Sequence, residues 1–249
     1  MRIATWNVQS LRKLYPEREA AFHSAMANVV ADVWVLTETW KTFSPGEGYR
    51  LMAESILGED LKIWKTWADR RWVTIWVKSD LHAKHQKVKI QPDRMACCRI
   101  EMPDVQDIVV VGTLLPWGSN DYLWPGLDGF CTSLVSQAAE WRAMRGEQKN
   151  CTLVVAGDFN QSIPFDECGY KRGETILNKA LKNLDLMCLT QGKCQFTNKP
   201  RIDHICVSRS GFDPESPPQS KNWEIPSCNG KPVTDHSGVY VDLEAQNIA

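Results

Sequence analysis

The sequence has no run of apolar residues as long as the roughly 18 that a membrane-spanning helix needs. It has no excess of charge of one sign, because 29 Lys and Arg stand against 30 Asp and Glu, a formal net charge of −1. The first residues, MRIATWN, contain no apolar stretch after the basic residue, so we expect no secretory signal. We therefore expect a cytoplasmic protein that does not act at a membrane. To hold nucleic acid, it would need a local basic patch rather than a high overall charge.

The nine cysteines show no CxxC spacing, which argues against a zinc site, a redox motif or a disulfide framework. We interpret them as small buried side chains in a reducing compartment. Internal repeats and low-complexity tracts are also absent. With 43% hydrophobic and 24% charged residues, the chain has the composition of a globular protein, and we expect one domain over residues 1–249, most simply a monomer.

Short apolar runs alternate with segments of helical periodicity, which predicts an α/β or α+β fold. The Pro-rich segment 211–232 lies between polar residues of interest and is predicted to be a loop at the rim of a site, with a short edge strand. Helices are predicted over residues 17–31, 127–144 and 174–184. Strands are predicted over residues 3–6, 33–36, 72–77, 96–102, 108–113, 152–156, 202–207 and 238–243.

Several of the predicted strands begin or end in a carboxylate, carboxamide or imidazole group. In a layered α/β protein, strand ends converge on a crevice where ligands bind. Glu, Asp and Asn oxygens are ligands of the kind that Mg²⁺ or Mn²⁺ prefers, and Asp with His forms an acid/base or phosphate-contact pair. Together these residues indicate metal-assisted hydrolysis of a phosphate ester. They are Asn7, Glu38, Asp158, Asn160, Asp203, Asp235 and His236.

The segments TWN, LTE, GDFN, RIDHI and TDH, in this order, resemble the motifs of the endonuclease/exonuclease/phosphatase superfamily, which includes deoxyribonuclease I. The resemblance runs from Asn7 to His236 and so covers nearly the whole chain. It implies a four-layer α/β/β/α sandwich with the site at the top of two packed sheets. It also implies a phosphodiesterase of nuclease type that uses Mg²⁺ or Mn²⁺ and acts on DNA or RNA.

The resemblance implies a metal site at Glu38, the principal ligand. Asn7 and Asp235 would help hold the metal, directly or through water. Gln9 stands where the nuclease branch of the superfamily often has Asp or Asn.

The resemblance also implies the catalytic roles. Asp158 would orient or deprotonate the attacking water, and Asn160 would contact the phosphate and steady Asp158. His236 would hydrogen-bond a phosphoryl oxygen, while Asp203 would fix the tautomer and orientation of its ring.

One position departs from the pattern, because Leu114 occupies the place of a histidine that donates a hydrogen bond to the scissile phosphate. Thr113 would take over that role if the strand register were shifted. The loop that follows carries Trp117 and Asn120, which we expect to contact substrate; the alternative is a loop folded on its own aromatic residues.

Other histidines and tryptophans favour structural interpretations. His204 follows Asp203 directly, and because neighbours in a strand face opposite ways, it is expected to pack in the sheet or meet solvent. The Trp-rich segment 64–76 is interpreted as amphipathic strands of a hairpin rather than as a stacking surface for bases. Two rival functions remain open: hydrolysis of a small-molecule or lipid phosphate ester, and a non-catalytic binding module of the same fold.

Overall fold

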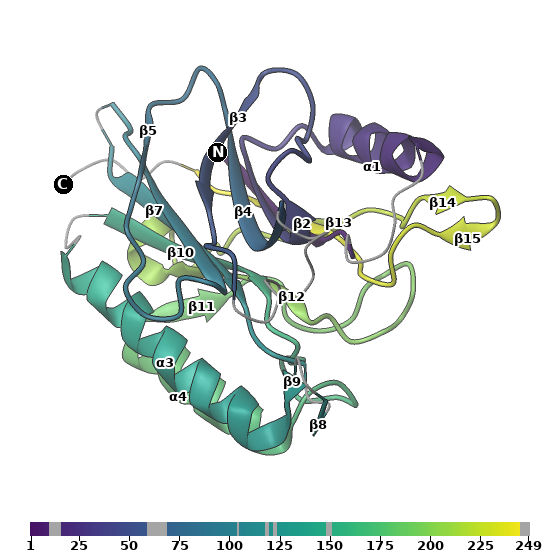
Figure 1. Ribbon diagram of the computed structural model, residues 1–249. Coiled ribbons are helices and arrows are strands. Elements are labelled where there is room, and N and C mark those ends of the chain that lie inside the picture. Colours follow the sequence, from purple (N-terminus) through teal and green to yellow (C-terminus); the bar gives the residue numbers. More distant parts are fainter. Residues whose placement is uncertain are drawn as a thin grey trace.

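The computed structural model describes residues 1–9, 16–58, 69–103, 105–117, 120–121, 124–147 and 151–244. Two six-stranded mixed sheets form its centre (Figure 1). The first sheet has the order β13 (Ser220–Asn222), β16 (Val239–Asp242), β1 (Arg2–Asn7), β2 (Val33–Trp40), β4 (Arg70–Lys78) and β3 (Tyr49–Glu54). The second has the order β11 (Leu186–Cys188), β12 (Asp203–Ser208), β10 (Cys151–Asp158), β7 (Asp107–Leu114), β6 (Met95–Ile100) and β5 (Ala83–His85).

Helices cover the outer faces of both sheets. The helix α1 (Pro16–Val29) packs Phe22 and Met26 against Trp6 and Trp34 of the first sheet. On the second sheet, α3 (Gly126–Glu147) and α4 (Lys171–Asn183) run side by side (Figure 1). Between the sheets lies a third core, formed by the side chains that face inward from each. This arrangement confirms the four-layer α/β/β/α sandwich predicted from the resemblance.

The central strands are apolar on both faces because each face is covered by another layer. In β10, for example, Leu153 and Val155 pack toward the helices, whereas Val154 and Ala156 pack into the core between the sheets. Burial of every residue of β10 explains why its sequence reads as a continuous apolar run rather than an alternating one. Continuing this alternation, Asp158 points to the side of the other sheet.

The predicted central strands and the three helices are all present, and the differences lie at their ends and at the sheet edges. α1 ends at Val29 rather than at residue 31, since Val30 has a left-handed φ of 52°. The edge strands β3, β5 and β11 were not predicted, because short edge strands carry little periodic signal, whereas β13 lies in the segment for which a short edge strand was expected. No helix among the described residues is both long and apolar enough to cross a membrane.

The Pro-rich segment 211–232 is a loop with more strand structure than predicted. It contains β13 and a two-stranded hairpin of β14 (Ser227–Cys228) and β15 (Lys231–Pro232). Asn229 and Gly230 connect the two strands with φ of 52° and 72°, the double left-handed geometry that an Asn-Gly pair supplies. Ile225 and Cys228 pack against the core beneath α1, so the hairpin is anchored beside the first sheet.

The Trp-rich segment is only partly described, since Trp64 and Trp67 lie outside the described residues. Trp72 and Trp76 lie in β4 and are buried, with 0% and 7% of their surface exposed. In the described part of the segment, these side chains belong to the core, as the hairpin interpretation expects.

Candidate active site

The two sheets bring their polar strand ends together at one edge. Asn7 ends β1 and Asp158 ends β10, and both continue the inward-facing side of their strands. Asp203 begins β12 and is the register partner of Asp158. The carboxamide of Asn7 joins the sheets, because its Nδ2 donates to Glu38 Oε1 at 3.0 Å and to Asp158 Oδ2 at 2.9 Å.

Glu38 reaches this cluster through an unusual backbone conformation. Strand alternation alone would place it on the side of Leu36, which packs under α1. Its φ of 48° lies in the left-handed region, which turns the side chain out of the alternation and toward Asn7. Such a backbone costs on the order of 1–3 kcal/mol, so it persists only where surrounding contacts hold it, as at functional sites.

His236 and Asp203 form the closest pair of the site, with Nδ1 and Oδ2 2.7 Å apart. The backbone around His236 is tied to β1: Trp6 Nε1 donates to the carbonyl of His236 at 3.0 Å. Thr234 Oγ1 donates to the carbonyl of Asn7 at 3.0 Å and accepts from the backbone N–H of His236 at 3.2 Å. Thr234 was not among the predicted site residues, although it is the first residue of the TDH segment.

Asp158 is held from its own loop as well as from Asn7. The backbone N–H of Asn160 donates to Asp158 Oδ1 at 2.8 Å, and Asn160 Nδ2 donates to the carbonyl of Leu115 at 2.7 Å. Asn160 has a φ of 47° and is buried. It therefore steadies Asp158, as expected, by folding the loop around the carboxylate.

Burial and mutual repulsion shift the ionisation of this cluster. Burial raises the pKa of Asp158 to about 7, and the nearby charge of Asp203 adds to the effect. Burial also raises the pKa of Glu38. For His236, burial alone would lower the pKa, but the charge and hydrogen bond of Asp203 outweigh it and raise the pKa to about 10. At neutral pH the imidazole is therefore a cation, and Asp158 is poised between its two protonation states.

The cluster fits a divalent cation. Four carboxylates, those of Glu38, Asp158, Asp203 and Asp235, act on one another electrostatically, against the single cationic ring of His236. The Oδ1 atom of Asp203 is buried without a hydrogen-bond partner among the described residues. Ligand atoms of Asp158, Asp203 and His236 lie within 4.8 Å of one another. Oxygen donors in this number suit Mg²⁺ or Mn²⁺.

Asp235 and Trp117 lie at the mouth of the site. The carboxylate of Asp235 is 68% exposed, and its Oδ1 lies 3.5 Å from His236 Nε2. Gln9 is next to it: Gln9 Oε1 accepts from the backbone N–H of Asp235 at 3.4 Å. A cavity of about 230 Å³, which we call the catalytic pocket, is lined by Asp203, Asp235 and His236, with the 45% exposed Trp117 in its wall.

Of the predicted site residues, Trp117, Asp203, Asp235 and His236 line this pocket, whereas Asn7, Glu38, Asp158 and Asn160 are not part of its lining. The predicted substrate contacts Thr113 and Asn120, and the departing position Leu114, also contribute no described side chain to it. Thr113 is fully buried on the helix-facing side of β7, where its hydroxyl donates to Gln137 of α3. Leu114 is fully buried in the core between the sheets, as the register partner of Asp158. Asn120 lies in the short strand β8 (Asn120–Asp121), and its side chain is outside the described part of the chain.

His204 packs within the sheet, which is one of the two placements expected from the sequence; the other was contact with solvent. It is fully buried, its Nε2 lies 2.9 Å from the carbonyl of Gln161, and its Nδ1 lies 3.2 Å from Thr190 Oγ1.

The profile of the Endonuclease/Exonuclease/phosphatase family matches residues 4–236. The chain belongs to this family. The match confirms the resemblance drawn from the sequence motifs. Membership of the endonuclease/exonuclease/phosphatase family supports phosphoester hydrolysis, and enzymes of this family use divalent metals.

Solved structures share the fold at low sequence identity. The endonuclease domain of TRAS1, a telomere-specific non-LTR retrotransposon, is 18% identical, with a TM-score of 0.65 and 99% of both chains covered. D. rerio TDP2 complexed with single-strand DNA product is 15% identical, with a TM-score of 0.65 and 98% of both chains covered. The AP endonuclease LMAP from Leishmania major is 15% identical, with a TM-score of 0.68, 96% of this chain and 86% of that chain covered. A search of the curated proteins finds no match.

Proposed function

We propose that the protein is a divalent-metal-dependent phosphodiesterase of nuclease type, which cleaves DNA or RNA by attack of water on phosphorus. The observation that carries the proposal is the Asp203–His236 pair set within 4.8 Å of the buried Asp158. The carboxylate of Asp158, with a pKa of about 7, is a base matched to neutral pH, and the cationic imidazole of His236 beside it lines the catalytic pocket as a hydrogen-bond donor.

In this proposal Asp158 accepts the proton of the attacking water. The Nε2–H of protonated His236 donates to a phosphoryl oxygen, where negative charge develops in the transition state. Asp203 holds the ring through Nδ1 and keeps it protonated. Asn7 and Asn160 are positioning residues, because their donors are used within the protein, on Glu38, Asp158 and the carbonyl of Leu115.

The metal would be held by Glu38 and Asp235, with Asn7 keeping the carboxylate of Glu38 in place. When bound, a divalent cation supplies Lewis-acid stabilisation of charge on the phosphoryl oxygens. The raised pKa values of Glu38 and Asp158, caused first by burial and then by the neighbouring carboxylates, fit a site built for such an ion, since carboxylates in these surroundings bind protons when no cation is present.

Among substrates, nucleic acid is favoured by two cations, Lys199 and Arg201, that line the catalytic pocket together with His236. A small-molecule phosphate ester is the second candidate, and the net charge of −1 is the observation in its favour. A monomeric, cytoplasmic protein remains our expectation.

The test is one panel of hydrolysis assays with Mg²⁺, Mn²⁺ or a chelator. Substrates are single- and double-stranded DNA, RNA, abasic DNA, nucleotides and inositol phosphates. We expect cleavage of at least one polynucleotide, lost with the chelator and regained with either metal. The Asp158→Asn variant should lose about 10²–10⁴-fold in kcat, the contribution of a general base. If only inositol phosphates or nucleotides are hydrolysed, the second candidate function is supported instead. If the Asp158→Asn variant is as active as wild type, Asp158 is not the base.

A further inference from the structure

A second and larger cavity, of about 600 Å³, adjoins the catalytic pocket, and we call it the lateral groove. The two cavities share Thr197, Lys199 and Asp235 in their walls, so the groove opens into the site. Its volume lies in the range of roughly 300–1,000 Å³ that is usual for pockets binding small ligands. A group attached to a phosphate at His236 can therefore extend into the groove while staying in contact with the protein.

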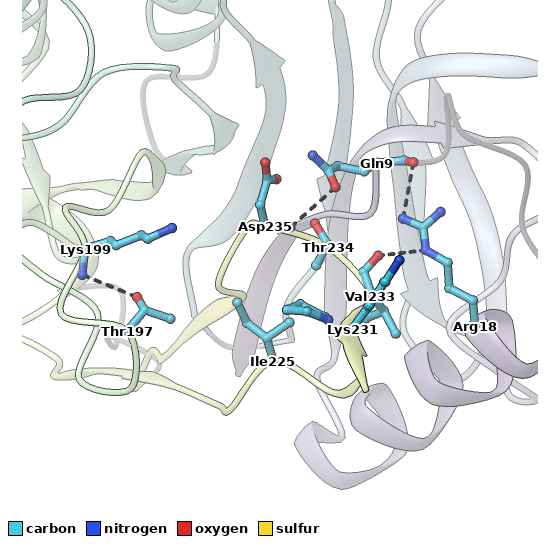
Figure 2. A pocket seen from close by; sticks show the side chains of 10 residues that line it. Gln9, Arg18, Thr197, Lys199, Ile225, Lys231, Val233, Thr234 and Asp235 are labelled. Carbon is cyan, nitrogen blue, oxygen red and sulfur yellow. Dashed lines mark hydrogen bonds between the residues drawn. The ribbon is translucent and has the colours of Figure 1, made fainter. Parts of the chain in front are cut away.

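The groove is basic, although the chain as a whole is not. Of the charged side chains described on its wall, Arg18, Lys199 and Lys231 are cations and Asp235 is an acid. Lys199 and Arg18 lie at opposite ends, with Asp235 and Lys231 between them (Figure 2). Asp235 stands where the groove meets the catalytic pocket. The other charged side chains described on the wall are all cations. This is the local basic patch that a nearly neutral protein needs to hold a polyanion.

The cations differ in what they are able to do. The guanidinium of Arg18 donates to the carbonyls of Val233 and Val8 at 2.7 and 3.3 Å, so it fixes the wall and adds charge. Lys199 and Lys231 are exposed, and no hydrogen bond or ion pair of their ammonium groups is present within the described residues. They come from two separate loops, Lys199 from the turn before β12 and Lys231 from the β14–β15 hairpin. Two long, flexible donors on separate walls suit a phosphate group lying between them.

Part of the groove wall is apolar. Ile225, Pro232 and Val233 line the groove beside Lys231, and Ile225 and Val233 belong to the core beneath α1. Such a wall contacts a sugar or a base face, whereas the lysines contact phosphate. A wall with apolar side chains next to cations matches a nucleotide, which has a base and sugar next to a phosphate.

We propose that the lateral groove binds the nucleotide next to the scissile phosphodiester, with Lys199 and Lys231 contacting its phosphate. The proposal rests on the proposed phosphodiesterase activity and narrows its substrate class. The preferred substrate is a polynucleotide that carries at least one further phosphate on the groove side, and an isolated phosphate ester leaves the groove empty.

The direct test is binding of a short fluorescein-labelled single strand, as DNA and as RNA, followed by fluorescence anisotropy. The protein carries Asp158→Asn to prevent turnover, with Lys199→Gln or Lys231→Gln added. The matched control is Lys179→Gln, an exposed lysine on α4 that lines neither cavity. Between about 50 and 200 mM NaCl, each groove variant should lower the slope of log Kd against log salt by about 0.7, the value for one lost phosphate contact to a single strand. Slopes equal to that of the control for both lysine variants would overturn the subsite.

A kinetic test separates this subsite from the activity itself. With Mg²⁺ or Mn²⁺, wild-type protein should cleave a trinucleotide with a lower KM than a dinucleoside monophosphate when the added phosphate lies on the groove side. Trinucleotides extended at either end are compared. Lys231→Gln should remove this gain. Cleavage of all three substrates with equal KM overturns the subsite and leaves the phosphodiesterase activity standing. Failure to cleave any phosphodiester, while the lysine-dependent salt slopes persist, overturns the activity and leaves the subsite standing.

Discussion

At the scale of single residues, the site depends on buried ionisable side chains whose pKa values are shifted by a neighbouring carboxylate. His236 would be a neutral ring by burial alone, and Asp203 keeps it cationic through a 2.7 Å contact. Asp158 is pushed the other way, toward protonation, by burial and by the same Asp203. One carboxylate therefore raises the pKa of both catalytic partners, in addition to the effect of burial on Asp158.

Asp203→Asn should move the alkaline limb of the kcat/KM profile to lower pH. An amide keeps a hydrogen bond to His236 but not the charge, so burial would then lower the pKa of the ring from about 10. The measurement is kcat/KM against pH for both proteins, with His236→Gln as the control for loss of the ring. An alkaline limb at the same pH in wild type and Asp203→Asn would contradict this account of His236.

Leu114→His is expected to destabilise the protein rather than to raise kcat. Leu114 is fully buried among Val110, Val154 and Ala156 between the sheets, so the imidazole would lose its hydration there. A buried polar group without good partners costs on the order of 1–3 kcal/mol. Urea unfolding measures the change, with Leu114→Met as the volume-conserving control. A variant of wild-type stability with increased kcat would show that the position faces the phosphate.

At the scale of elements, the TDH segment is held by contacts from distant parts of the chain. Arg18 of α1 donates to the carbonyl of Val233 at 2.7 Å and to that of Gln9 at 3.4 Å. It thereby fastens the end of β1 to the residues that lead from the β14–β15 hairpin into Thr234 and His236. A small displacement of this segment would also displace the ring of His236, and misplacement of a catalytic group slows the reaction strongly.

Arg18→Gln should lower the free energy of unfolding by about 1–3 kcal/mol, since charged donors to half-buried carbonyls are lost. It should also lower kcat, because His236 follows three residues after Val233. Arg172→Gln is the matched control: Arg172 pairs with Asp128 on the exposed faces of α4 and α3, where such a pair is worth little. Equal melting temperatures for the two variants would show that the Arg18 contacts do not hold the segment.

The sequence allowed the central strands, the helices and the strand-end residues to be predicted, because continuous apolar runs and the polar groups after them are local signals. The direction of Leu114 and Thr113 was not predictable, since β7 is buried on both faces and its alternation carries no polar side. Glu38 reaches Asn7 only through a left-handed φ, which no spacing rule reveals. The lateral groove joins α1 to two separate loops, and its lysines stand far apart in the sequence.

At the scale of the whole molecule, the two sheets meet at an edge that concentrates negative charge. Asn7 bridges them with neutral hydrogen bonds, while carboxylates approach from β2, β10 and β12. Without a metal ion, bound protons reduce the repulsion between these carboxylates and so stabilise the folded state. The stability of the metal-free protein is therefore linked to pH, and metal binding replaces protons.

The stabilisation of the protein by Mg²⁺ should increase with pH. Asp158 has a pKa of about 7 in the folded protein against an ordinary value of 3.8, so between these values the folded state holds a proton that the unfolded chain has lost. Stability of the metal-free protein then falls as pH rises through this window. His236, with a pKa of about 10 against 6.5, extends the fall in stability from pH 6.5 to 10.

A divalent cation compensates the ionised carboxylates, so the Tm difference with and without Mg²⁺ should be small near pH 4 and larger at pH 7 and above. Scanning calorimetry across this range measures it, and Asp158→Asn should flatten the part of the metal-free curve below pH 7. A Tm difference that is greatest at pH 4 would show that the cation does not bind at these carboxylates.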